Sequence, residues 1–262
     1  QCYADKGDCP KGILSIPDVR FYSLEGEKGN TLTFAMRLRK IIRKENPSRV
    51  LSFLYYPNIV AYLSLYRLKI PFVLSERSNH RLYLGSSFKH RIWRVILAVA
   101  YRKAFRIVTV SEGVRRFIAD DFRINPSKIE VIYNGIDFEA LDRLKKEPLD
   151  DFVFKKELKY ILAAGSLVKA KNYPLLIESF RILAGRHNDI RLLILGAGSL
   201  EKDLKQKVKD FKLEEKVTFL GYSENPYRYM AAATCFVLSS DWEGFPNSLL
   251  EAMYVNGHVV ST

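Results

Sequence analysis

The chain has 262 residues, of which 48% are hydrophobic and 13% aromatic, a composition that excludes an intrinsically disordered protein. The longest apolar run, residues 95–101, is far too short for a membrane-spanning helix, and no signal peptide is recognisable. Residues 1–148 hold 27 Lys and Arg against 15 Asp and Glu, whereas residues 149–262 hold 15 against 14. The basic first half therefore predicts an anionic surface or partner.

In the first half, short apolar runs alternate with longer amphipathic segments. Strands are predicted at residues 13–21, 50–54, 71–74, 106–110 and 129–132. Helices are predicted at residues 31–44, 58–68 and 88–105. This alternation favours a parallel sheet with helices between its strands. The charged segment that follows, residues 138–151, is interpreted as a linker.

The second half repeats the alternation. Strands are predicted at residues 160–164, 191–195, 217–220, 234–238 and 258–260. Helices are predicted to begin at Pro174, at Leu200 and near Asn247. The sequence thus predicts an α/β protein with two Rossmann-like domains, residues 1–145 and 146–262.

The three cysteines do not indicate a metal site. Cys2, Cys9 and Cys235 have no spacing typical of zinc ligands, so no metal is expected. Cys2 and Cys9 could pair with each other. An odd count without a recognisable signal peptide favours reduced thiols in the cytoplasm.

The most informative stretch, residues 241–251, reads Asp-Trp-Glu-Gly-Phe-Pro-Asn-Ser-Leu-Leu-Glu and joins a predicted strand to a predicted helix. Gly244 and Pro246 favour a loop, and Asn247 or Ser248 is predicted to cap the helix. Amides at a helix start, together with the helix dipole, favour an anion beside this loop.

Two carboxylates, Glu243 and Glu251, lie eight residues apart in this stretch. Phosphate would repel them, so they are predicted to accept hydrogen bonds from hydroxyl groups, as in a sugar or ribose clamp. In the alternative interpretation, Glu251 is an acid in the first turns of a helix and Glu243 is a solvated loop residue.

Residues 243–253 resemble the donor-site signature of the retaining glycosyltransferases of family 4, which have the GT-B fold of two Rossmann-like domains facing across a cleft. The resemblance implies that Glu243 contacts the transferred sugar and that Glu251 binds the nucleotide ribose. It also implies that Asn247, Ser248 and Leu249 bring the amides of a helix start to the diphosphate, and that Phe245 and Pro246 belong to the donor site.

Other parts of the second half follow the same family pattern, with one departure. The loop after residues 160–164 starts at Gly165, and Lys171 matches the family's lysine. Ser166 replaces the family's arginine, so either Lys169 substitutes for it or the donor is held more weakly. Tyr222 lies where the family meets the nucleotide base, and it could stack there or simply pack. The Gly196-Ala-Gly198 run is weak evidence for phosphate binding.

The resemblance implies that residues 1–145 form the acceptor-side domain and that residues 146–262 form the domain that binds the nucleotide sugar. In the first of these, it places Glu76, Arg77 and Ser111 on the acceptor side. His80 is interpreted as a surface residue. The family pattern also begins before and continues beyond this chain. We therefore expect an internal fragment, with the first strand–helix–strand unit of one domain and the end of the other missing.

The predicted function is retaining transfer of a hexose or N-acetylhexosamine from a nucleotide-diphosphate sugar, with UDP expected, to a lipid-linked or polysaccharide acceptor in cell-surface glycan synthesis. Glu243 and Lys171 are the predicted catalytic residues, and no cofactor is expected. A sugar phosphorylase or a nucleotide-sugar epimerase is the alternative on the same fold. A basic nucleic-acid-binding protein is the alternative from another class, but the chain contains no recognised nucleic-acid module, and no nucleic-acid partner is expected.

The positive charge also predicts a location. The cluster at residues 37–44 and a face formed by Arg91, Arg94, Arg102 and Arg106, beside Trp93 and Tyr101, fit an anionic membrane surface. The alternative is an ordinary solvated face of a buried helix. We expect a peripheral protein on the cytoplasmic face of a membrane.

Overall fold

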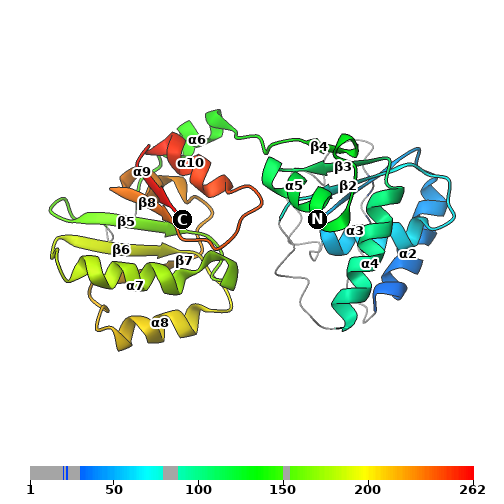
Figure 1. Ribbon diagram of the computed structural model, residues 1–262. Coiled ribbons are helices and arrows are strands. Elements are labelled where there is room, and N and C mark those ends of the chain that lie inside the picture. Colours follow the sequence, from blue (N-terminus) through cyan, green and yellow to red (C-terminus); the bar gives the residue numbers. More distant parts are fainter. Residues whose placement is uncertain (1–19, 21, 23–29, 79–87, 150–153) are drawn as a thin grey trace. The chain divides into compact units, whose positions relative to one another are not determined.

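The computed structural model describes residues 20, 22, 30–78, 88–149 and 154–262 (Figure 1). The chain divides into two compact units, residues 1–133 and 134–262, and each is built on its own parallel sheet. The predicted strand at 13–21 lies outside the described residues except for Arg20, and so do Cys2, Cys9 and His80.

The first unit has a four-stranded parallel sheet in the order β1-β2-β3-β4. Its strands are β1 (Val50–Phe53), β2 (Phe72–Glu76), β3 (Arg106–Thr109) and β4 (Ile129–Val131). Its helices are α2 (Thr31–Glu45), α3 (Tyr55–Leu65), α4 (Phe88–Lys103) and α5 (Glu112–Phe122), with a short 3₁₀ turn at Pro126–Lys128. Helix α3 contacts both α2 and α4, so the three form one helical layer.

Local sequence explains where these helices begin and end. The Asn30 side chain accepts from the Thr33 amide and caps α2, and Asn46 ends the helix in the left-handed conformation. Helix α3 begins three residues earlier than predicted, because Pro57 is tolerated in a first helical turn. Helix α4 ends at Lys103, two residues earlier than predicted, and Arg106 is the first residue of β3, where the strand was predicted to begin.

The second unit has a five-stranded parallel sheet in the order β7-β6-β5-β8-β9. Its strands are β5 (Lys159–Ala164), β6 (Ile190–Leu195), β7 (Val217–Gly221), β8 (Cys235–Leu238) and β9 (Val259–Ser261). Its helices are α6 (Phe138–Leu144), α7 (Tyr173–Ala184), α8 (Glu201–Asp210), α9 (Tyr227–Ala232) and α10 (Asn247–Val255), with a 3₁₀ turn at Lys169–Lys171.

This strand order creates a switch point beside β5. The chain runs outward from β5 to β6 and β7, then returns to place β8 on the other side of β5. Helices α7 and α8 pack on one face of the sheet and α9 and α10 on the other (Figure 1). Ligands of such folds bind at the carboxyl ends of the strands near this reversal.

Helix α6 corrects the predicted linker. The Asp137 side chain accepts from the Ala140 amide at 2.9 Å and caps this helix, which packs on α9 and α10. The structure thus groups residues 138–144 with the second unit, although the sequence placed them before a boundary at 145. The assignment of an acceptor-side domain and a nucleotide-sugar domain stays a prediction.

Among the described residues, no helix has the length and apolar composition needed to cross a bilayer. Within the same residues, no cluster of His, Cys, Asp and Glu side chains could hold a metal ion.

Candidate functional site

Two loops meet at the carboxyl ends of β5 and β8, the strands on either side of the switch point. The Asp241 amide donates to the Ala170 carbonyl at 3.0 Å, and Asn172 Nδ2 donates to Asp241 Oδ1 at 2.6 Å. Ser239 Oγ donates to the Lys171 carbonyl at 2.9 Å. These bonds fix the lysine-bearing loop, residues 165–172, against the first residues of the acidic stretch.

The two predicted catalytic residues contact each other across this junction. Lys171 Nζ donates to Glu243 Oε1 at 2.6 Å, and both side chains are largely shielded from solvent. Ser240 Oγ donates to the same carboxylate oxygen at 2.7 Å. A charge-assisted bond of this length gives both groups a defined position before any ligand arrives.

Tyr173 supports the base of the lysine loop. Its hydroxyl donates to the Gly165 carbonyl at 3.0 Å. Burial, with a smaller contribution from the Glu243 charge, raises the pKa of Tyr173 well above its ordinary value. Tyr173 therefore remains a protonated donor and holds the loop start in place.

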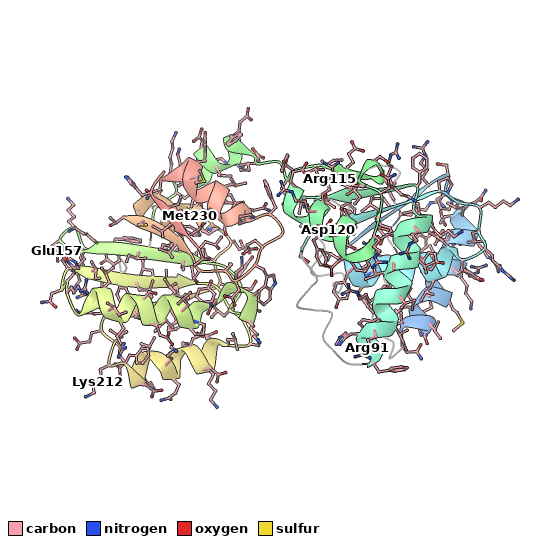
Figure 2. All side chains as sticks on the ribbon, in the orientation of Figure 1. Arg91, Arg115, Asp120, Glu157, Lys212 and Met230 are labelled. Carbon is pink, nitrogen blue, oxygen red and sulfur yellow. The ribbon has the colours of Figure 1, made fainter. Side chains whose placement is uncertain are left out.

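A cavity of about 310 Å³ opens beside this junction. Five predicted donor-site residues line it: Gly165, Ser166, Tyr222, Ser248 and Glu251. The rest of the lining consists of Ala164, Leu195, Gly196, Ala197, Ser223, Pro226 and Met230, which Figure 2 labels on α9. A Cβ built on Gly165 would lie 3.8 Å from Lys171 Nζ, so the lysine ammonium is close to the cavity wall.

The other predicted donor residues do not line this cavity. Lys169 is exposed in the 3₁₀ turn, and Phe245, Pro246 and Leu249 lie outside the lining. The side chain of Asn247 accepts at 2.7 Å from Asn134 Nδ2. The predicted side-chain cap is wrong, because the helix begins at Asn247, its cap residue is Pro246, and no side chain caps it.

Glu251 lies on α10. It forms part of the cavity wall and is half-buried. Burial raises the pKa of its carboxyl group, while a hydrogen bond with the Tyr227 side chain lowers it. Tyr227 lies on α9 and was not predicted as a site residue. Its contact with Glu251 joins α9 and α10, two consecutive helices that β8 separates in the chain.

The Gly196-Ala-Gly198 run has a packing role that its sequence did not specify. A Cβ at Gly196 would lie 2.0 Å from the Gly165 carbonyl oxygen, and one at Gly198 would lie 2.5 Å from the Leu167 carbonyl oxygen. The Leu167 amide donates to the Ala197 carbonyl at 2.9 Å. Both glycines therefore allow the β6 loop to pack directly against the lysine-bearing loop.

The predicted acceptor-side residues lie in the first unit. Glu76 is fully buried at the end of β2, where Tyr101 Oη donates to its Oε1 at 2.5 Å and Asn58 Nδ2 donates to the same atom at 2.8 Å. Ser111 caps α5 by accepting from the Val114 amide at 3.2 Å. Arg77 follows Glu76 and is partly exposed. In this structure Glu76 and Ser111 hold local structure, and an acceptor contact for any of the three stays a prediction.

Comparison with known proteins identifies the sequence pattern. Residues 2–140 match the family described as Glycosyltransferase Family 4, and residues 145–262 match Glycosyl transferases group 1. An N-acetylgalactosamine-N,N'-diacetylbacillosaminyl-diphospho-undecaprenol 4-alpha-N-acetylgalactosaminyltransferase of Campylobacter jejuni is 34% identical over 258 residues, which are 94% of this chain and 68% of the relative. An uncharacterized glycosyltransferase of Methanocaldococcus jannaschii is 28% identical over 237 residues, or 86% of this chain and 58% of the relative.

A solved structure supports the fold. The Anabaena protein HepE, crystallised with UDP and glucose, matches with a TM-score of 0.72 at 18% identity, over 92% of this chain and 66% of that one. The chain thus spans 58% to 68% of the length of these relatives.

Proposed function

Because this chain belongs to the glycosyl transferases of group 1 and family 4, with the predicted GT-B class of α/β fold, we propose that it is part of an enzyme that transfers a sugar from a nucleotide-diphosphate donor. The observation that carries this proposal is the Lys171–Glu243 pair beside a cavity into which Glu251 projects. A cation and two separate carboxylates match the phosphate, sugar and ribose of such a donor.

The nucleotide occupies the 310 Å³ cavity in this proposal. Tyr222 lies exposed at the end of β7 and offers a ring to the base, while Glu251 accepts hydrogen bonds from the ribose hydroxyls. Helix α10 begins at Asn247, and its next residue, Ser248, lines the cavity, so the start of this helix directs its dipole toward the diphosphate. UDP is the preferred nucleotide, in line with the nucleotide bound by the Anabaena protein.

Donor binding rearranges the lysine–glutamate pair. The diphosphate competes with Glu243 for the Lys171 ammonium, which then stabilises the negative charge that develops as the anomeric C–O bond breaks. Glu243 is released to accept hydrogen bonds from the sugar hydroxyls. Ser166 supplies no cation at the position where the family has arginine, so Lys171 is the main fixed positive charge of this loop.

In this proposal the enzyme transfers a hexose or N-acetylhexosamine with retention of its anomeric configuration. The acceptor is a lipid-linked glycan or a polysaccharide. The name of the Campylobacter relative, which specifies a diphospho-undecaprenol-linked glycan, supports this class. The positive charge of residues 1–148 is consistent with a peripheral position on the cytoplasmic face of a membrane.

A thermal-shift screen tests the donor. UDP should raise the melting temperature of the full-length protein, since a ligand at roughly 100 times its Kd stabilises the folded state by about 2.7 kcal/mol. GDP should give a much smaller shift. Glu251→Ala should remove the UDP response without lowering the melting temperature of the free protein by a similar amount. A shift with GDP and none with UDP would refute the choice of nucleotide.

The raised pKa of Glu251 predicts a pH dependence of nucleotide binding. Only the ionised carboxylate accepts two hydroxyl donors, so affinity should fall as the pH drops through a value above the ordinary 4.5 of glutamate. Tyr227→Phe removes the hydrogen bond that lowers this pKa and should move the loss to higher pH. UDP affinity measured calorimetrically between neutral and mildly acidic pH checks both statements. Glu251→Gln is the control, because its profile retains only the titration of the nucleotide.

A further inference from the structure

A second cavity, of about 430 Å³, opens at the amino end of β2. Four aromatic side chains form much of its wall: Tyr62, Tyr66, Phe72 and Phe105. Tyr66 and Phe105 are 56% and 55% exposed, and exposed rings gathered in one concave wall are typical of a ligand site. Glu76 lies at the opposite, carboxyl end of the same strand, so this cavity is separate from the predicted acceptor side.

The charged groups of this wall are cations. Arg67, Lys69 and Lys103 line the cavity, and within the described part of the chain no Asp or Glu does. The Arg67 guanidinium carbon lies 5.6 Å from the centre of the Tyr66 ring. Among the described residues, no side chain forms an ion pair or a hydrogen bond with the charged groups of these three cations. The wall therefore combines aromatic rings with positive charge that nothing neutralises.

The chain around the cavity, at the amino edge of the first sheet, is also positively charged. Five Lys or Arg and no Asp or Glu occur in the segments that lead into its four strands: residues 46–49, 66–71, 104–105 and 123–128. Part of this charge stabilises helix ends, since Lys128 Nζ donates to the Arg102 carbonyl at 2.6 Å. Burial lowers the pKa of Lys128, and the charges of Arg106 and Lys103 lower it further. Like charges are thus crowded at this edge, and a bound anion would reduce their repulsion.

The cations of α4 do not form the face that the sequence predicted. Arg94 donates to Asp121 Oδ2 at 3.0 Å, and Arg102 donates at 3.2 Å to the carbonyl of the last residue of α5, so both are directed toward that helix. Tyr101 is fully buried. The predicted basic face beside it is therefore wrong in its composition. Lys103, the last residue of α4, is exposed and lines the cavity instead.

We propose that this cavity binds an aromatic anion, in which a phosphate or carboxylate group is attached directly to a ring. The ring packs against Tyr66 and Phe105, and the anionic group binds the three cations of the wall. A nucleotide does not match this chemistry, because its ribose needs hydroxyl acceptors such as Glu251 in the donor cavity. Among the described residues that line the second cavity, none has a carboxylate or amide side chain. The inference does not rest on the proposed function.

Ligand-observed NMR titrations of the full-length protein test this inference with phenyl phosphate as the probe. Inorganic phosphate and phenol are compared with it, since each supplies one half of the probe. Phenyl phosphate should bind saturably and at least about tenfold more tightly than either half. Excess UDP should not displace it, and Glu251→Ala should bind it like the wild type, because UDP and Glu251 belong to the donor cavity.

Arg67→Gly tests the cationic part of the site. Arg67 has a φ of +62°, a left-handed conformation that Gly adopts without strain, so this variant should melt at or above the wild-type temperature. It should bind phenyl phosphate about tenfold more weakly. The matched control is Arg123→Gly, because Arg123 is exposed at the same edge of the sheet with a φ of +51° but does not line the cavity. The control should bind the probe like the wild type.

Phe105→Leu tests the aromatic part, because it keeps an apolar side chain but removes the ring. This variant should lose most of the preference for phenyl phosphate over inorganic phosphate. Absence of saturable binding, equal affinity of the wild type for phenyl phosphate and inorganic phosphate, or displacement of the probe by UDP would overturn the inference. So would an equal loss of affinity in Arg123→Gly and Arg67→Gly. Turnover with a nucleotide sugar is measured separately, so failure of this inference is distinct from failure of the proposed enzyme.

Discussion

Lys171→Ala should lower kcat/KM of the full-length enzyme by about 10²–10³-fold, the usual effect of removing one group that stabilises transition-state charge. Lys171 Nζ is fixed at 2.6 Å from Glu243 and lies beside the cavity wall at Gly165. Its loss removes the main fixed cation from the departing diphosphate and also leaves a shielded carboxylate without its ion-pair partner. Steady-state kinetics with a nucleotide sugar measures the effect.

Control variants separate this role from general charge loss. Lys202→Ala removes an exposed lysine of α8 and should leave turnover unchanged. Lys169→Ala, in the same 3₁₀ turn as Lys171, should cost much less than Lys171→Ala, because Lys169 is exposed and does not line the cavity. Glu243→Ala should also reduce turnover strongly, and the double variant should lose less than the two single effects combined, because the residues are coupled. Turnover at the wild-type level in both Lys171→Ala and Glu243→Ala would refute the site.

Gly196→Ala should destabilise the second unit and prevent nucleotide binding. The added Cβ would lie 2.0 Å from the Gly165 carbonyl oxygen, and Gly196 has a φ of +145°, which is strained for any residue with a side chain. Two backbone segments must separate to admit it, so we expect a loss of at least ~2 kcal/mol in the free energy of unfolding. Denaturant unfolding and UDP titration measure the two effects.

Gly135→Ala is the matched control, because a Cβ there meets nothing within 4 Å. It should leave both stability and UDP binding close to those of the wild type. If Gly196→Ala were as stable as Gly135→Ala and bound UDP normally, the lysine-bearing loop would not depend on close packing against the β6 loop.

Within the described residues, local sequence signals predicted each strand, and they predicted the helices α2, α3, α4, α7, α8 and α10. Helix α5 was not among the predicted helices. Residues 160–164 and 192–195 are short, continuous apolar runs, and the structure buries them between two helical layers. Helix α6 was missed because its seven residues lie in a charged segment, and packing on α9 and α10 stabilises it. Its Asp137 cap was a signal that could have revealed it.

The candidate site was predictable in its residues but not in their contacts. The sequence indicated Lys171, Glu243 and Glu251, whereas the bond from Asn172 to Asp241 and the contact of Tyr227 with Glu251 join segments far apart in the chain. Sequence periodicity also could not show that Glu76 is enclosed by Asn58 and Tyr101, because a charge is ordinarily expected on the surface. Tertiary contacts decide these positions.

Analysis of the reaction products tests the central claim most directly. Full-length protein is incubated with a UDP-linked α-hexose or α-N-acetylhexosamine and a lipid-linked acceptor, and the products are identified by NMR. The account predicts stoichiometric UDP and a new glycosidic bond in which the sugar retains its α configuration. A β-linked product, a sugar 1-phosphate, or an epimerised sugar without a new glycosidic bond would contradict it.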